Sequence, residues 1–256
     1  MRVLTAGDSN FYHCMTGLAQ SVRKHYGQQL IVYDIGLTEE QRQNIDAEIR
    51  KIDIEADYSG YISHHNTNFI KTTHKPFCIK HYFENSSEPL IYADADCLFL
   101  EKVELDGFDV AVTVKPKRKR DTKNYFNGII NAGVIFFNSY PEKLVERWIQ
   151  ECSSGEHTDQ SALAKILSET IDWKETGKVY DWQGLSVKTL PIETYNDYYL
   201  RSGKIFHFKG DRHEGETYNT LLTAINENRN PYSLFKRKTT SPFFRFLKSL
   251  LSPVKK

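Results

Sequence analysis

The feature that most constrains this chain is residues 89–100, an apolar and β-prone run interrupted by Asp94 and Asp96. Such a run predicts a buried strand, in which a carboxylate needs a partner. Because side chains alternate across a strand, residues two apart share a face, and we expect both carboxylates to point at one spot. Oxygen ligands of this kind suit Mg²⁺ or Mn²⁺, and a cation with few protein ligands keeps positions open for phosphate oxygens. The pair therefore predicts a divalent-cation site for a diphosphate substrate, although aspartates at this spacing also simply cap turns at strand ends.

The first fifty residues alternate between strand and helix patterns. Apolar runs predict strands at 3–6 and 30–35, and helical spacing of apolar residues predicts a helix that ends at Gly27. A capping box begins at Thr38 and predicts a second helix that runs to about Arg50. This order predicts a parallel sheet flanked by helices, with ligands beyond the carboxyl ends of the strands. Asp8 and Asp94 both fall at such ends.

The remaining elements are read in the same way. We expect a polar loop over 59–73, helices over 76–83, 141–152 and 160–167, and strands over 109–114, 131–138 and 205–208. Asp159 is the expected N-cap of the helix over 160–167. Gly133 in the strand over 131–138 indicates either close approach of a ligand to the backbone or a bulge.

Length and charge limit the number of domains and the classes of partner that this chain can have. A chain of 256 residues suits one main domain. Residues 234–256 carry seven Lys or Arg and no acid, which leaves 27 basic against 33 acidic residues and a net charge of −6 before that tail. A domain of this sign is a poor general nucleic-acid binder, so no nucleic-acid partner is expected. The four cysteines lack CxxC spacing, which indicates a reducing cytoplasm, and we find no signal peptide and no apolar run of about 18 residues.

Residues 115–120 contain five cations in six positions, beginning at Lys115. Such a run is typical of a solvated loop. The alternative is a rim that attracts a phosphorylated or otherwise anionic acceptor.

Five short motifs occur in a telling order: 7–12 (GDSNFY), 94–96 (DAD), 131–133 (NAG), 159–160 (DQ) and 207–210 (HFKG). Together they resemble the GT-A fold nucleotide-sugar glycosyltransferases, and within them glycosyltransferase family 8, over residues 1–215. The resemblance implies an α/β fold with a Rossmann-like, mixed and mainly parallel sheet flanked by helices. It also implies a metal-dependent enzyme that moves a hexose from a UDP-sugar donor to a hydroxyl of a glycan or glycolipid acceptor with retention of configuration, as in lipopolysaccharide or polysaccharide biosynthesis.

The resemblance assigns roles to the first motifs. Asp8 and Asn10 would bind the nucleotide together with Tyr12, or else Phe11, which would stack on the uracil ring. Asp94 and Ala95 would also contact the nucleotide. The resemblance implies that the metal, Mn²⁺ or Mg²⁺, is held by three ligands: Asp94, Asp96 and His207. Taken alone, His207 is also compatible with a core histidine.

The later motifs would surround the sugar and the phosphates. The sugar-binding residues implied by the resemblance are Lys75, Asn131, Ala132, Gly133, Asp159 and Gln160, with Lys80 a competitor for the place of Lys75. Asp159 and Gln160 would be catalytic, Asp159 accepting hydroxyl hydrogen bonds and Gln160 lying near the anomeric carbon. The family often places a lysine where this chain has Asp211, Arg212 and His213. We therefore expect Lys209, Gly210 and His213 at the phosphates, with Arg212 as an alternative.

Two alternative functions are left open, and the C-terminal tail is expected to act as a membrane anchor. A nucleotidyltransferase would favour a cation in the loop after the first strand, where 7–12 has none. The third possibility is a sugar-nucleotide-binding protein without turnover. We expect a catalytic domain over 1–231 and a basic amphipathic tail over 232–256. That tail is expected to hold a cytoplasmic protein at the anionic inner face of the membrane, the alternative being a helix docked on the domain.

Overall fold

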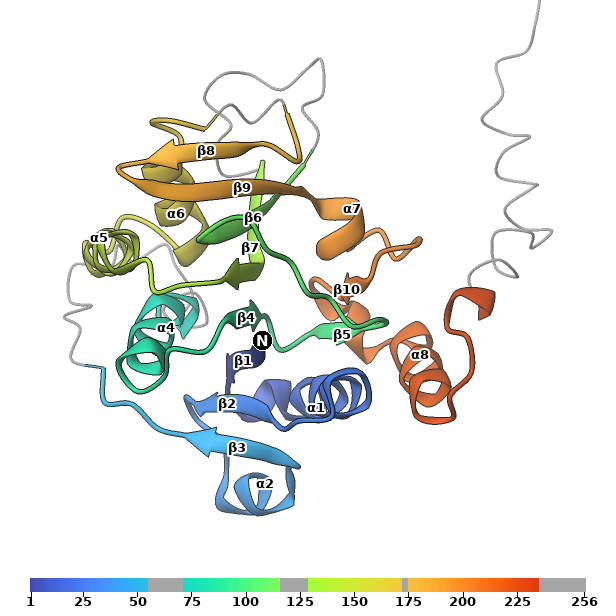
Figure 1. Cartoon of the computed structure of the whole chain (residues 1–256). Coiled ribbons are helices and arrows are strands. Elements are labelled where there is room, and N and C mark those ends of the chain that lie inside the picture. The colour runs from blue at the N-terminus through green and yellow to red at the C-terminus, as the bar shows by residue number, and fades with distance from the viewer. Residues whose placement is uncertain (55–70, 116–128, 172–174, 235–256) are drawn as a thin grey trace, which may run out of the picture.

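The computed structural model describes residues 1–54, 71–115, 129–171 and 175–234 (Figure 1). The predicted basic tail lies outside them from residue 235 on, as do residues 116–120 of the cationic run and most of the predicted loop over 59–73. Within the described residues, no helix combines the length and the apolar character that crossing a membrane requires.

Eight strands form one sheet in the order β3-β2-β1-β4-β7-β6-β9-β8. The strands are β1 (Arg2–Gly7), β2 (Leu30–Asp34), β3 (Ala47–Arg50), β4 (Leu90–Ala93), β6 (Val110–Val114), β7 (Ile130–Phe137), β8 (Val179–Trp182) and β9 (Leu185–Pro191). Strands β3, β2, β1 and β4 are parallel to one another, β7 is antiparallel to both of its neighbours, and β6 is parallel to β9. The carboxyl ends of β1, β4, β6 and β9 therefore meet the amino end of β7 at one edge of the sheet.

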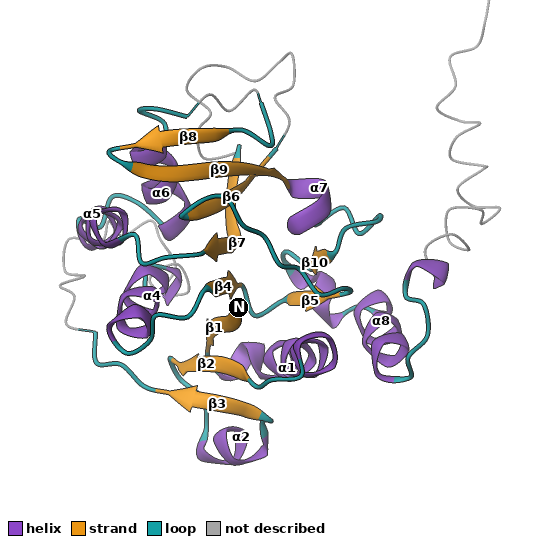
Figure 2. Cartoon of the chain, in the orientation of Figure 1, coloured by secondary structure: helices purple, strands orange, loops and turns teal. Residues whose placement is uncertain are grey.

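Helices cover both faces of this sheet (Figure 2). They are α1 (Tyr12–Tyr26), α2 (Glu39–Asn44), α4 (Lys75–Glu84), α5 (Glu142–Ser153), α6 (Asp159–Leu167), α7 (Ile192–Tyr195) and α8 (Glu216–Asn226), with 3-10 turns η1 (Ser9–Phe11) and η3 (Asp211–Glu214). In Figure 1, α4, α5 and α6 lie on one face, and α1 and α8 lie on the other. The GT-A fold expectation of a mixed, mainly parallel sheet flanked by helices is confirmed.

The strands are apolar on both faces because both faces are covered. Leu4 packs in the cluster beneath α4, α5 and α6, whereas its neighbour Val3 packs in the cluster beneath α1. Ile31 and Val32 of β2 divide between the two clusters in the same way. Period-two alternation in strands buried on both faces produces continuous apolar runs of this kind. A third cluster joins α8 to a small sheet of β5 (Cys97–Phe99) and β10 (Ile205–His207).

Two local expectations about helix ends hold. Helix α1 ends at Gly27, whose φ of 68° is the left-handed conformation that glycine adopts without strain, and the Gly27 amide donates to the Arg23 carbonyl oxygen. Thr38 and Gln41 form the predicted capping box of α2.

The helix predicted to run to about Arg50 is wrong in its second half. Helix α2 ends at Asn44, and residues 47–50 form β3 instead. Pairing with β2 satisfies the backbone of this segment, and Glu48 in β3 accepts hydrogen bonds from Arg2 and Arg50. The pairing with β2 and the contact with Arg2 join residues far apart in the sequence. They override the local preference for a helix, and local patterning does not detect them.

The predicted cap of α6 is shifted by one residue. The side chain of Thr158 accepts the hydrogen bond of the Ser161 amide at 3.3 Å and is the N-cap, so Asp159 is the first helical residue. The Asp159 carboxylate is thereby left for another partner. Elements β3, β8, β9, α7 and α8 had not been predicted from the sequence.

Candidate functional site

The carboxylates of Asp94 and Asp96 lie on a turn and not on one face of a strand, which corrects the expectation from the run over 89–100. After β4 the chain turns at 94–96, where the Cys97 amide donates to the Asp94 carbonyl oxygen at 3.0 Å, and continues as β5. The turn is needed because β4 belongs to the large sheet whereas β5 pairs with β10.

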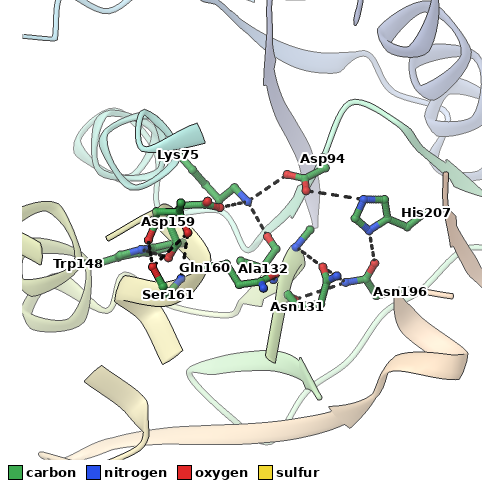
Figure 3. A network of polar contacts seen from close by, with 12 residues as sticks. Lys75, Asp94, Asn131, Ala132, Trp148, Asp159, Gln160, Ser161, Asn196 and His207 are labelled. Atoms are coloured by element: carbon green, nitrogen blue, oxygen red, sulfur yellow. Dashed lines mark hydrogen bonds and ion pairs between the residues drawn. The ribbon is translucent and has the colours of Figure 1, made fainter. Parts of the chain in front are cut away.

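The two carboxylates nevertheless converge on one imidazole. His207 at the end of β10 places Nε2 3.2 Å from Asp96 Oδ1. The same atom lies 3.9 Å from Asp94 Oδ2 (Figure 3). The Asp94 amide donates to the Gly133 carbonyl oxygen at 2.7 Å, which fixes the turn against β7. The three residues expected to hold a metal are thus brought together by β4, β5 and β10.

Asn196, which no motif had indicated, orients the His207 ring. Its Oδ1 lies 2.8 Å from His207 Nδ1, while its Nδ2 lies 2.9 Å from both Asn131 Oδ1 and Thr113 Oγ1. Since the amide nitrogen faces acceptors, the amide oxygen faces the ring and accepts its Nδ1–H. A neutral His207 therefore carries its lone pair on Nε2, toward the carboxylates, which is the tautomer a metal ligand needs.

Gly133 is required by the close approach of His207. A Cβ at this position would lie 2.5 Å from His207 Cε1 and 2.7 Å from its Nδ1. The pairing of β6 with β7 is also irregular here, passing from Val112↔Ile135 to Thr113↔Asn131, which confirms the predicted bulge, while close approach of a ligand stays a prediction. Asn131 Oδ1 accepts the Gly133 amide at 2.8 Å and supports the irregular backbone.

Lys75, at the start of α4, joins the metal motif to the sugar motifs. Its Nζ lies 2.6 Å from Asp159 Oδ2 and 3.0 Å from Asp94 Oδ1, and donates to the Ala132 carbonyl oxygen at 2.8 Å (Figure 3). The side chain is 4% exposed. Burial opposes its charge, but the carboxylates of Asp159 and Asp94 raise the Lys75 pKa well above its usual value. Lys80, the competitor for this place, instead faces the carboxylates of Glu84 and Glu146 at the surface.

Burial and neighbouring charges shift the pKa values of the site residues in opposite directions. Burial raises the pKa of Asp94 above its usual value even though Lys75 and His207 lower it. The His207 charge and hydrogen bond outweigh burial at Asp96 and lower the pKa of that carboxyl, and Asp96 in turn raises the His207 pKa against burial. A positive charge at this position is therefore favoured, whether it is a ring proton or a bound cation.

The donor set fits a divalent cation. Two carboxylates and one imidazole nitrogen are compatible with Mn²⁺, whose preferences include oxygen ligands. The Cys97 sulfur is the other candidate ligand near Asp96 and His207, but burial and the charges of Asp96 and Asp94 raise its pKa far above the usual value. Without a bound cation, the protonated thiol is therefore favoured over the thiolate.

The sugar motifs meet at the start of α6. Gln160 Oε1 accepts the Ala132 amide at 3.4 Å, and the Asp159 carbonyl oxygen accepts the Trp148 indole at 2.7 Å. Ala132 on β7 thus lies beside the two residues of α6 expected to be catalytic, and Lys75 contacts Ala132, Asp159 and Asp94 (Figure 3). Asn131 and Gly133 face Asn196 and His207 instead.

The nucleotide motif lies beyond the end of β1. Asp8 is buried, accepts the Asn10 amide at 3.0 Å and forms an ion pair with Lys71, which the sequence had not singled out. Phe11 is 39% exposed, whereas Tyr12 packs against the core cluster beneath α1. Phe11, the alternative to Tyr12 for stacking on the base, is therefore the exposed aromatic ring at this end of the sheet.

Of the residues expected at the phosphates, His213 is the most deeply placed. Lys209 and Gly210 are exposed, and His213 is 8% exposed with its Nδ1 3.2 Å from His13 Nε2. The His213 ring also lies 5.5 Å from the ring centroid of Phe11, which places it beside the nucleotide motif. The side chain of Arg212 is outside the described part of the structure.

Comparison with known proteins identifies solved structures with a similar fold. No protein-family model matches the chain, and no curated protein matches it. Its structure is similar to that of the galactosyltransferase LgtC in complex with donor and acceptor sugar analogues, with a TM-score of 0.55, 15% sequence identity and coverage of 96% of this chain and 99% of LgtC. It is also similar to the bifunctional glycosyltransferase WbbM, with a TM-score of 0.51 and 11% identity over 94% of this chain and 52% of that one.

A glycosyltransferase involved in glycosylation of the major capsid of PBCV-1 gives a TM-score of 0.50 at 12% identity, over 83% of this chain and 96% of that one. The chain therefore has the fold of these glycosyltransferases, and it resembles the GT-A class that the motifs predicted.

Proposed function

We propose that the protein is a metal-dependent glycosyltransferase that moves a hexose from a UDP-sugar to a hydroxyl of a glycan or glycolipid. The observation that carries this proposal is the convergence of Asp94, Asp96 and His207 next to the Lys75–Asp159 ion pair, at the sheet edge where the expected nucleotide motif also lies. A site with a metal triad, a buried lysine and sugar-binding groups on a glycosyltransferase fold fits transfer from a nucleotide sugar.

The donor would lie along this edge. Asp8, Asn10 and Phe11 or Tyr12 would hold the uridine, with Ala95 on the other side of the nucleotide. Asp94, Asp96 and His207 would hold Mn²⁺ or Mg²⁺, which when bound neutralises the diphosphate charge. Stacking of the base on an aromatic ring of this kind contributes about 1–3 kcal/mol.

The chain's own residues would assist departure of the nucleoside diphosphate. The leaving diphosphate gathers negative charge, and one cation about 4 Å away contributes on the order of 4 kcal/mol at an effective dielectric constant near 20. The residues proposed for this role are Lys209, the Gly210 backbone and His213, of which His213 is buried.

The sugar ring would face the start of α6. Lys75 holds the Asp159 carboxylate in place for hydroxyl groups, and Gln160 would lie near the anomeric carbon. The family resemblance favours retention of configuration, and Asn131, Ala132 and Gly133 would line the sugar site together with Gln160, which contacts Ala132.

Product analysis tests the proposal. Incubation with UDP-sugars and Mn²⁺ should release UDP, and Asp96→Asn should abolish Mn²⁺-dependent release, while the exposed Asp106→Asn serves as a matched control. Release of pyrophosphate from UTP and a sugar phosphate would instead identify a nucleotidyltransferase. Tight UDP-sugar binding with neither product would identify a binding protein without turnover.

For the basic tail we propose a peripheral anchor at an anionic membrane surface, on the cytoplasmic side. Support comes from the sequence, since residues 235–256 hold seven cations and no acid, each worth about 1 kcal/mol near an anionic surface. Leu234 and Tyr232 pack against the cluster around α8, so a deletion of 235–256 keeps these contacts. The full chain should sediment with anionic vesicles at low salt and the shortened chain should not; equal sedimentation would contradict the anchor.

A further inference from the structure

Two cations and two tyrosines are gathered after β6 and α7. Lys115 Nζ lies 5.2 Å from the ring centroid of Tyr198, and Arg201 Cζ lies 5.2 Å from that of Tyr199. The two rings are themselves 4.5 Å apart and tilted by 40°. Cations held over ring faces are attracted by the aromatic quadrupole and are restricted in position.

Asp197 holds the loop that carries Tyr198, Tyr199 and Arg201. Its buried carboxylate accepts the backbone amides of Tyr199, Arg201, Ser202 and Gly203 at 2.8–3.1 Å. Leu200 in the middle of the loop has a φ of 55°, in the left-handed region that non-glycine residues rarely occupy. A strained backbone kept in place by a buried carboxylate is typical of segments that position functional groups.

This group lies beside the candidate active site. Strands β6 and β9 end at the same edge as β4, and Lys115 directly follows β6. Asn196, whose Oδ1 contacts His207, is two residues before Tyr198, so their Cα atoms are at most about 7.6 Å apart. In the sheet order, β6 and β9 lie on the other side of β4 from β1, and Asp8 directly follows β1. The donor nucleotide and this group would thus flank the metal motif from opposite sides.

We propose that Lys115, Tyr198, Tyr199 and Arg201 form a binding surface for the acceptor, and that the acceptor is an anionic sugar that carries a phosphate or a carboxylate. The inference rests on the proposed glycosyl transfer and names the acceptor class. The planar guanidinium of Arg201 matches both anions by paired hydrogen bonds, and among the described residues no carboxylate forms an ion pair with it. Cations already restrained over aromatic rings lose less side-chain entropy when an anion binds.

The test measures sugar binding to the full chain saturated with UDP and Mn²⁺. Glucose 6-phosphate, glucuronate and glucose serve as probes, titrated by calorimetry or ligand-observed NMR. We expect at least one anionic sugar to bind at least tenfold more tightly than glucose, and the binding to weaken with added salt. A preference for the phosphate or for the carboxylate identifies which anion the acceptor carries.

Variants locate the binding. Arg201→Gln and Lys115→Gln should each weaken the anionic sugar about tenfold, whereas Arg229→Gln, an exposed arginine paired with Glu227 after α8, should not. Equal affinity for glucose and both anions, or unchanged affinity in Arg201→Gln and Lys115→Gln, would overturn the proposal. Mn²⁺-dependent UDP binding, measured on the same samples, separates the two failures. Its absence from the wild-type protein would refute the proposed function, and its presence without anion preference would refute only the acceptor class.

Discussion

Replacing Asn196 by Ala should weaken metal binding without removing any metal ligand. The side chain is fully buried, and its Oδ1 is the partner of His207 Nδ1 at 2.8 Å. Without it, the ring loses the contact that fixes both its orientation and its tautomer. The Nε2 lone pair is then no longer held toward Asp94 and Asp96.

The size of the effect follows from the contacts that are lost. Removing the hydrogen-bond partner of a metal-ligating histidine costs about 10–100-fold in metal affinity, which is about 1.4–2.7 kcal/mol. The unpartnered Nδ1–H also lowers the free energy of unfolding by about 1–3 kcal/mol. Asn131 Oδ1 is less affected because it still accepts the Gly133 amide at 2.8 Å. The variant should therefore fold and bind Mn²⁺ weakly.

Two further variants separate orientation from stability. Asn196→Asp keeps an acceptor for His207 but loses the donors to Asn131 and Thr113, so it should lose stability while keeping Mn²⁺ affinity. Asn138→Ala removes one side-chain hydrogen bond, from Asn138 Nδ2 to the Phe108 carbonyl oxygen at 3.0 Å, away from the site.

The assay is Mn²⁺ titration by electron paramagnetic resonance in the presence of UDP, combined with urea unfolding. If folded Asn196→Ala binds Mn²⁺ within twofold of the wild-type protein, or if Asn138→Ala weakens Mn²⁺ as much, the orienting role of Asn196 is refuted.

Three other variants test the rest of the site. Gly133→Ala places a Cβ 2.5 Å from His207 Cε1 and should lower both the free energy of unfolding and Mn²⁺ affinity; wild-type values in urea and Mn²⁺ titrations would contradict the close approach. Lys75→Met leaves the buried carboxylate of Asp159, and the partly exposed carboxylate of Asp94, without their cation and should cost about 3–5 kcal/mol in urea unfolding, a loss below 1 kcal/mol being incompatible with the buried Lys75–Asp159 ion pair. Phe11→Leu should weaken UDP by about 1–3 kcal/mol in calorimetry with little effect on stability, and unchanged UDP affinity would exclude Phe11 as the stacking ring.

The sequence predicted the central part of the site because its residues are tied to strand ends. Asp94 directly follows β4 and His207 ends β10, and the apolar runs of both strands are visible without any structure. The convergence of Asp94 and Asp96 was anticipated from a wrong local geometry, a strand face in place of a turn, and His207 was added by the family resemblance. The expectation that both carboxylates point at one spot still holds, because the turn between β4 and β5 brings both of them to the His207 ring.

Residues that act through long-range contacts had no local signal. Asn196 lies 11 positions from His207 in no recognisable motif, and Lys71 lies 63 positions from its partner Asp8. Strand β3 was missed for the same reason, since only pairing with β2 distinguishes residues 47–50 from the end of a helix. Pattern reasoning finds what a segment does on its own, and these elements depend on what the fold places beside them.

The charge of the protein raises the question of how an acidic domain would bind a diphosphate. Ions screen the net charge of −6 before the tail beyond about 8 Å at physiological salt. Lys75 is buried, so its charge acts at short range through a medium less polar than water, where one charge at 4 Å is worth on the order of 4 kcal/mol. Charges close to the donor therefore matter more for diphosphate binding than the net charge of the domain. The exposed Arg201 has no such protection, so salt should weaken an anionic acceptor more than it weakens the donor.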